Sequence, residues 1–80
     1  MDNVNDASPK DVYGNTPLTF AARSGHLEVS KLIIQRVKDK NPANYEGFTP
    51  LHEAAYYGHL NVFQLIFDLA ENKNPEDYPK

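Results

Sequence analysis

The three histidines and Ser24 are the side chains whose types and spacing could support metal binding or nucleophilic catalysis. His52 is followed by Glu53 and, seven positions later, by His59. The zinc-binding H-E-x-x-H pattern instead places its second histidine four positions after the first, on the same face of a helix. Ser24 lies two positions before His26, and neighbours in sequence rarely reach the geometry of a nucleophile and its base. We therefore expect neither a metal site nor a catalytic serine.

Carboxylates and glycines are the remaining candidates for catalytic chemistry. Glu46 and Glu53 could form an acid–base pair, but nothing in the surrounding sequence would desolvate them. The four glycines occur singly, so no glycine-rich loop could hold a phosphate. We expect a protein that is not an enzyme and that has no cofactor, no metal and no small-molecule substrate.

Composition limits the class of protein further. The chain has 80 residues, of which 40% are hydrophobic and 24% charged, the balance of one small globular domain. It contains no cysteine, which excludes disulfides and zinc–thiolate sites. Its aliphatic runs at 32–34 and 65–67 are interrupted within a few residues, so we expect no membrane span. The first ten residues are polar and acidic, unlike a signal peptide, and we expect a cytoplasmic protein.

An internal repeat accounts for most of the chain. Residues 9–41 and 42–74 align without a gap, and 15 of the 33 positions are identical. Residues 1–8 are then the end of a preceding repeat or a disordered leader, and residues 75–80 begin a third copy. Because about three repeats are normally needed for a stable stack, we expect a piece of a longer array or a chain that completes its core by self-association.

Each copy predicts two helices joined by a turn. A threonine at the N-cap and a proline at the first helical position begin the first helix, and a glycine ends it. A histidine follows that glycine, and we expect it to hydrogen-bond backbone at the turn. These positions are Thr16, Pro17, Gly25 and His26 in the first copy, and Thr49, Pro50, Gly58 and His59 in the second. The segments 11–15 and 44–48, which precede the helices, carry turn residues.

The second helix of each copy has an apolar face at helical spacing. This face consists of Val29, Leu32, Ile33 and Val37 in the first copy, and of Val62, Leu65, Ile66, Leu69 and Ala70 in the second. In the second copy Leu60, Phe63 and Phe67 add another apolar stripe, which predicts burial on two sides. We therefore expect this stripe to meet a further repeat or to mediate self-association.

These features resemble the ankyrin repeat, a family with a 33-residue period and the motif T-P-L-H-x-A. Residues 49–59 read TPLHEAAYYGH, and residues 16–26 read TPLTFAARSGH. The resemblance implies an all-α solenoid of two helix-turn-helix units, with β-turn loops that project at right angles to the helices. It also implies that His52 hydrogen-bonds the backbone of the loop before it.

Three departures from the ankyrin pattern stand in this sequence. Thr19 replaces the usual histidine of the first copy. Val37 and Ala70 replace the glycine that usually follows the second helix, so we expect that helix to run longer. Lys80 stands where a third copy would have its turn glycine.

The resemblance implies a non-enzymatic protein–protein interaction module that binds a protein through its loop tips and first helices. An aromatic cluster in the second copy favours that surface, because aromatic side chains with a polar tip are enriched at interfaces. The predicted partner-binding residues are Val12, Tyr13, Asn15, Arg23, Ser24, Tyr45, Glu46, Phe48, Tyr56 and Tyr57. Two alternatives for the aromatic residues stay open: Tyr45 and Phe48 could pack on the next loop, and Tyr56 could be partly covered.

The distribution of charge bears on the kind of partner. Residues 9–41 carry six basic and three acidic side chains, whereas residues 42–74 carry one basic and four acidic. The basic residues alternate with acids and no aromatic residues interleave them, so we expect no nucleic-acid partner. The opposite charges of the copies favour head-to-tail stacking at low salt. The alternative function is therefore a structural spacer or self-stacking unit of a longer array.

Overall fold

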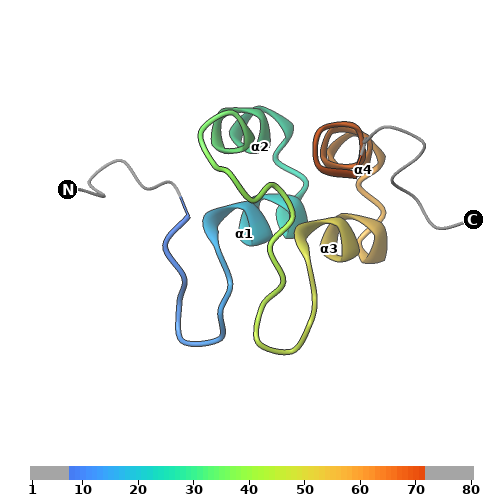
Figure 1. Ribbon diagram of the computed structural model, residues 1–80. Helices are drawn as coiled ribbons and strands as arrows, with labels where there is room; N and C mark the ends of the chain where they lie inside the picture. The colour runs from blue at the N-terminus through green and yellow to red at the C-terminus, as the bar shows by residue number, and fades with distance from the viewer. Residues whose placement is uncertain (1–7, 72–80) are drawn as a thin grey trace, which may run out of the picture.

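The computed structural model describes residues 8–71, which form two stacked pairs of antiparallel helices (Figure 1). The first pair consists of α1 (Pro17–Ser24) and α2 (Leu27–Ile34). The second pair consists of α3 (Pro50–Tyr56) and α4 (Leu60–Ile66), and a π-helical segment, η2 (Phe67–Glu71), continues α4. No strand occurs between residues 8 and 71. The predicted all-α ankyrin solenoid is confirmed.

Each helix pair lies inside one of the two predicted repeats. Helices α1 and α2 fall within residues 9–41, and α3, α4 and η2 fall within residues 42–74. The predicted leader (except residue 8) and the predicted start of a third repeat at 75–80, with its Lys80, lie outside the described residues.

The first helix of each repeat begins where the Thr-Pro pair predicts. Thr16 and Thr49 are N-caps in extended conformation, and each hydroxyl accepts a hydrogen bond from the backbone N–H three residues later. The side chain at that third position bonds back to the N-cap backbone N–H, from Thr19 at 3.0 Å and from His52 at 3.0 Å. This reciprocal capping box satisfies two backbone donors that a helix start would otherwise leave unpaired.

The second helices end differently in the two repeats. In the first repeat α2 stops at Ile34, and the Lys40 ammonium group donates to the backbone carbonyls of Ile34 and Val37 at 2.7 Å each. A cation at this end complements both the free carbonyls and the helix dipole. In the second repeat η2 lengthens the helix to Glu71. The expectation of a longer second helix is therefore correct for the second repeat and wrong for the first.

The core lies where the two pairs meet, with α1 packed on α3 and α2 on α4. It is formed by the buried residues Leu18, Ala22, Ile34, Ala54, Val62 and Ile66. The two alanines allow the first helices to approach closely, while the larger aliphatic side chains fill the space between the repeats. This close packing also brings the two loops side by side below the helices (Figure 1).

The predicted apolar face of α2 is not the face that α2 buries. Val29 and Leu32 are 49% and 54% exposed, and the buried residues of α2 are Ser30 and Ile34. The predicted face of the second copy is buried at Val62 and Ile66 of α4, which are 1% and 0% exposed, whereas Leu69 in η2 is 50% exposed. The reason is position in the stack: α2 buries the stripe that meets α4, and its predicted face points away from that contact. Val37, which follows α2, is buried as expected.

Within residues 8–71 no helix is long and apolar enough to cross a membrane.

A groove between the loop tips and the first helices

The two loops have the same internal construction. In the first loop one carboxylate oxygen of Asp11 accepts hydrogen bonds from the backbone N–H groups of Tyr13 at 2.8 Å and Asn15 at 2.9 Å. In the second, the amide oxygen of Asn44 accepts from the N–H groups of Glu46 at 2.9 Å and Phe48 at 3.0 Å. Asp and Asn favour turns for this reason, because a short side chain can replace a backbone acceptor.

Asp11 differs from Asn44 in being ionisable. Partial burial opposes ionisation, but the hydrogen bonds from Asn15 and Tyr13 outweigh it and hold the pKa of Asp11 below its ordinary value of 3.8. The carboxylate is therefore the form that organises the first loop at neutral pH.

Three contacts tie the second loop to the first. The backbone N–H of Tyr45 donates to the carbonyl of Tyr13 at 3.0 Å, and the Asn44 amide donates to the Asn15 side-chain oxygen at 2.9 Å. The Tyr45 ring also lies against Gly14, where a β-carbon would come within 2.7 Å of the ring. The two loops consequently form one continuous wall.

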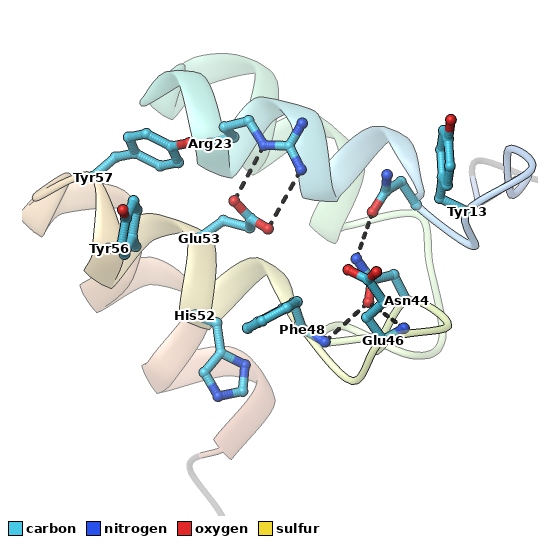
Figure 2. A pocket seen from close by; sticks show the side chains of 10 residues that line it. Tyr13, Arg23, Asn44, Glu46, Phe48, His52, Glu53, Tyr56 and Tyr57 are labelled. Atoms are coloured by element: carbon cyan, nitrogen blue, oxygen red, sulfur yellow. Dashed lines mark hydrogen bonds and ion pairs between the residues drawn. The ribbon is translucent and has the colours of Figure 1, made fainter.

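A groove of about 690 Å³ lies between this wall and the exposed sides of α1 and α3, within the range of ~300–1,000 Å³ typical of ligand pockets. Figure 2 shows Tyr13 and Glu46 on one side of it and Tyr56 and Tyr57 on the other. The groove is lined by Tyr13, Asn15, Arg23, Asn44, Glu46, Phe48, His52, Glu53, Tyr56 and Tyr57.

An ion pair occupies the floor of the groove. The Arg23 guanidinium donates to both carboxylate oxygens of Glu53, at 3.1 Å from Nε and 3.4 Å from Nη2 (Figure 2). The same guanidinium lies over the Phe20 ring, 5.1 Å from its centroid. The hydrogen bond to Glu53 raises the pKa of Arg23 above its ordinary value. Because this pair joins α1 to α3, it also fixes the distance between the two helices that form the groove.

Aromatic rings supply most of the remaining lining. Tyr56 and Tyr57 meet edge to face, with ring centroids 4.9 Å apart. Phe48 meets His52 in the same manner at 6.0 Å. All three of Phe48, Tyr56 and Tyr57 stay exposed, so these contacts orient the rings without covering them. The alternative in which Tyr56 is partly covered is wrong, since it is 81% exposed.

The histidines are structural, apart from His26. The His52 ring accepts from the Thr49 backbone N–H through Nδ1, which is the loop-backbone bond that the resemblance implies. The His59 ring bonds the Arg23 carbonyl at 3.1 Å, which confirms backbone bonding but places the acceptor in the first repeat. The His26 side chain makes no capping hydrogen bond to α2.

Seven of the predicted partner-binding residues line the groove, and three lie elsewhere. Ser24 is exposed beside it, Val12 is exposed at the loop tip, and Tyr45 packs on the first loop rather than on a following one. Asn15 is buried and holds Asn44, so only part of it faces the groove.

Asn44, His52 and Glu53 line the groove but were not among the predicted residues. Two of them carried a signal in the sequence. Asn44 aligns with Asp11 as a turn residue, and Glu53 lies one helical turn before the aromatic pair on the same first helix. The pairing of Glu53 with Arg23 spans 30 residues, and local spacing does not reveal such a contact.

The residues predicted for self-association lie on the outer side of α4 and in η2. Leu60 is 71% and Phe67 44% exposed, and Phe63 is half-buried. The Phe63 and Phe67 rings stack at 6.0 Å and border a smaller hollow beside Leu51.

Among residues 8–71 no three His, Cys, Asp or Glu side chains gather as a metal ion would require. In the groove, the Glu53 carboxylate pairs with Arg23 and the His52 ring with the N-cap of α3.

Comparison with known proteins agrees with the geometry. No curated protein matches the chain. A family model that describes ankyrin repeats in three copies matches residues 1–77. Ankyrin repeats generally mediate protein–protein interactions and typically have no enzymatic activity. Since the match covers nearly the whole chain, the protein belongs to the ankyrin-repeat family.

Proposed function

We propose that this chain is a non-enzymatic protein-recognition module that binds a partner protein in the groove between its loop tips and first helices. The observation that carries the proposal is the groove itself, because both repeats build it and exposed aromatic side chains line it. Nucleic acid, membrane and small-molecule substrates are not part of this function. The cytoplasmic location expected from the sequence stays a prediction.

Preorganisation supports this function. The loops are held by the Tyr45–Tyr13 and Asn44–Asn15 hydrogen bonds, and the helices by the Arg23–Glu53 ion pair. A surface that is already ordered loses little conformational entropy when a partner binds. Large aromatic side chains then contribute contact area at low entropic cost.

The function is tested by site-specific photo-crosslinking of the chain in its cell extract. A photoreactive residue at Tyr56, in the groove, is compared with one at Lys31, on the exposed side of α2 outside it. We expect a discrete partner to crosslink from position 56 and not from position 31. The same crosslink should be lost in the Phe48→Ala/Tyr57→Ala variant, whose side chains are exposed and whose fold should survive by circular dichroism.

Identical crosslinked products from both positions, or an undiminished crosslink in the folded double variant, would contradict the proposal. In either case the groove would not be the surface that selects the partner.

Self-association is the second candidate, and the uncovered side chains of Leu60 and Phe67 support it. Burying these apolar side chains against a second copy would remove them from water. Light scattering over a wide concentration range tests this. A Leu60→Ser/Phe67→Ser variant should shift any oligomer toward monomer, whereas a native monomer at high concentration would rule it out.

A further inference from the structure

The charges in the groove do not balance. Three charged side chains line it, Arg23, Glu46 and Glu53. Arg23 and Glu53 neutralise one another through two hydrogen bonds. The Glu46 carboxylate is exposed and forms no ion pair with any residue between 8 and 71. The groove therefore has one uncompensated negative charge, which lies on the loop wall.

The backbone of Glu46 is fixed although its carboxylate is unpaired. Its N–H donates to the Asn44 side-chain oxygen at 2.9 Å, and Asn44 is itself bonded to Asn15. The backbone that carries this side chain is thus ordered before any partner binds, which reduces the entropy lost on binding.

The positive charge of Arg23 is already neutralised. Two of its donors are directed to Glu53, and its face is covered on one side by Phe20. An acidic partner that drew Arg23 away from Glu53 would leave a carboxylate that is only 12% exposed without its cation, which is costly. The groove accordingly offers carboxylates and phosphates no uncompensated positive charge.

Aromatic rings lie on both sides of the groove that the unpaired carboxylate lines (Figure 2). Figure 2 shows Tyr13 on the same side as Glu46, with Tyr56 and Tyr57 facing them across the groove. All three tyrosine rings are exposed. Ring faces attract cations, and the aliphatic stem of a lysine or arginine packs well on such surfaces.

We propose that the groove selects a basic peptide segment of the partner protein, whose lysine or arginine side chain pairs with Glu46 between the tyrosine rings. This inference rests on the proposed function and specifies the chemistry of the partner. Charge complementarity carries it: the free charge in the groove is negative, and the one lining cation is already neutralised.

The test is a selection from a displayed library of random peptides against the whole chain, repeated with two charge-reversal variants. The native chain should enrich peptides with lysine or arginine. Glu46→Arg should enrich aspartate or glutamate instead. Glu28→Arg is the matched control, because Glu28 is exposed on α2 outside the groove, and it should enrich the same basic peptides as the native chain.

A binding measurement then isolates the ion pair. An enriched peptide is compared with its copy in which the basic residue is glutamine, against the native chain and Glu46→Gln. We expect about fivefold weaker binding from either single change and little further loss from both together. High salt should weaken the native pair and leave the doubly changed pair almost unaffected.

The possible outcomes separate this inference from the proposed function. Enriched peptides without basic residues, or the same peptides from Glu46→Arg, would overturn the charge selection. If those peptides still lose binding in Phe48→Ala/Tyr57→Ala, the groove remains the binding surface. No enrichment, or enriched peptides that bind this double variant as well as the native chain, would overturn both.

Discussion

The two repeats share 15 of 33 residues but use identical residues differently. Val29 and Val62 occupy the same position of the repeat, and they are 49% and 1% exposed. Each second helix buries the stripe that meets the other repeat, so the same residue is surface in α2 and core in α4. In a stacked array, whether a position is buried therefore depends on which neighbouring repeat packs against it and not on the residue type alone.

The repeats also contribute differently to the groove. The first supplies Tyr13, Asn15 and Arg23, whereas the second supplies the free carboxylate of Glu46 and most of the aromatic surface. The N-cap positions of the helices are therefore identical in the two repeats, whereas the positions that line the groove differ between them. Each prediction below compares equivalent positions of the two repeats, so that the shared backbone framework is held constant and the difference in environment is measured.

The largest difference is expected between Gly25→Ala and Gly58→Ala. Both glycines have φ of 74°, where alanine costs roughly 1–2 kcal/mol. At Gly25 a β-carbon would also come within 2.5 Å of the His59 ring, whereas nothing lies within 4 Å of one at Gly58. We expect a loss of about 3 kcal/mol from Gly25→Ala and about 1 kcal/mol from Gly58→Ala, measured by urea unfolding. Equal losses would mean that the His59 ring moves away freely.

The next difference is expected between Val62→Ala and Val29→Ala. Val62 is fully packed between the repeats, so removing two methyl groups should cost about 2 kcal/mol. Val29 is half exposed, and its replacement should cost less than about 0.5 kcal/mol. Thermal unfolding of both variants checks this. A substantial loss from Val29→Ala would show that residues outside the described part of the chain cover α2.

A smaller effect is expected at the third position of the first helix, which is Thr19 in one repeat and His52 in the other. Both side chains complete a capping box. His52→Thr should therefore leave the free energy of unfolding nearly unchanged, whereas His52→Ala should lower it by about 1 kcal/mol. Chemical denaturation measures both. If His52→Thr were as destabilising as His52→Ala, the ring contact with Phe48 would matter more than the cap.

The smallest effect is a difference in acid sensitivity between the loops. The pKa of Asp11 is lowered in the folded protein, so its stabilising effect is present above its ordinary value of 3.8. That effect is lost as the pH falls through the lower folded value. Asn44 makes the equivalent hydrogen bonds without a titratable group. We expect the amide NMR signals of Tyr13 and Asn15 to shift in acid, and that of Phe48 to stay unchanged.

Asp11→Asn gives the first loop the chemistry of the second and is the control for this titration. Its Tyr13 and Asn15 signals should lose their response to acid. A response that persists in Asp11→Asn would assign the titration to another group.

The local features of the fold could be predicted from the sequence, whereas the contacts between the repeats could be predicted only in part. The N-caps at Thr16 and Thr49, the turn segments and the helix pairs follow from rules that act within a few residues. The spacing of apolar residues could not decide which stripe of α2 is buried. The stripe with Val29 and Leu32 and the stripe with Ile34 both carry large aliphatic side chains, so either could form a core face. The loop-tip and aromatic residues of the candidate groove were predictable from their residue types. The place of Glu53 in the groove was not, because it depends on the contact with Arg23, which lies 30 residues earlier in the sequence.

The sequence by itself determined the 33-residue repeat, the capping of its helices and the ankyrin-repeat family, because backbone hydrogen bonding and turn geometry depend on neighbouring residues. Only the tertiary structure decided that Ile34 rather than Leu32 enters the core and that Arg23 is neutralised by Glu53. It also decided that Glu46 keeps a free charge beside exposed tyrosine rings. Burial and charge pairing are properties of the packed stack, since they depend on which side chains another repeat brings close.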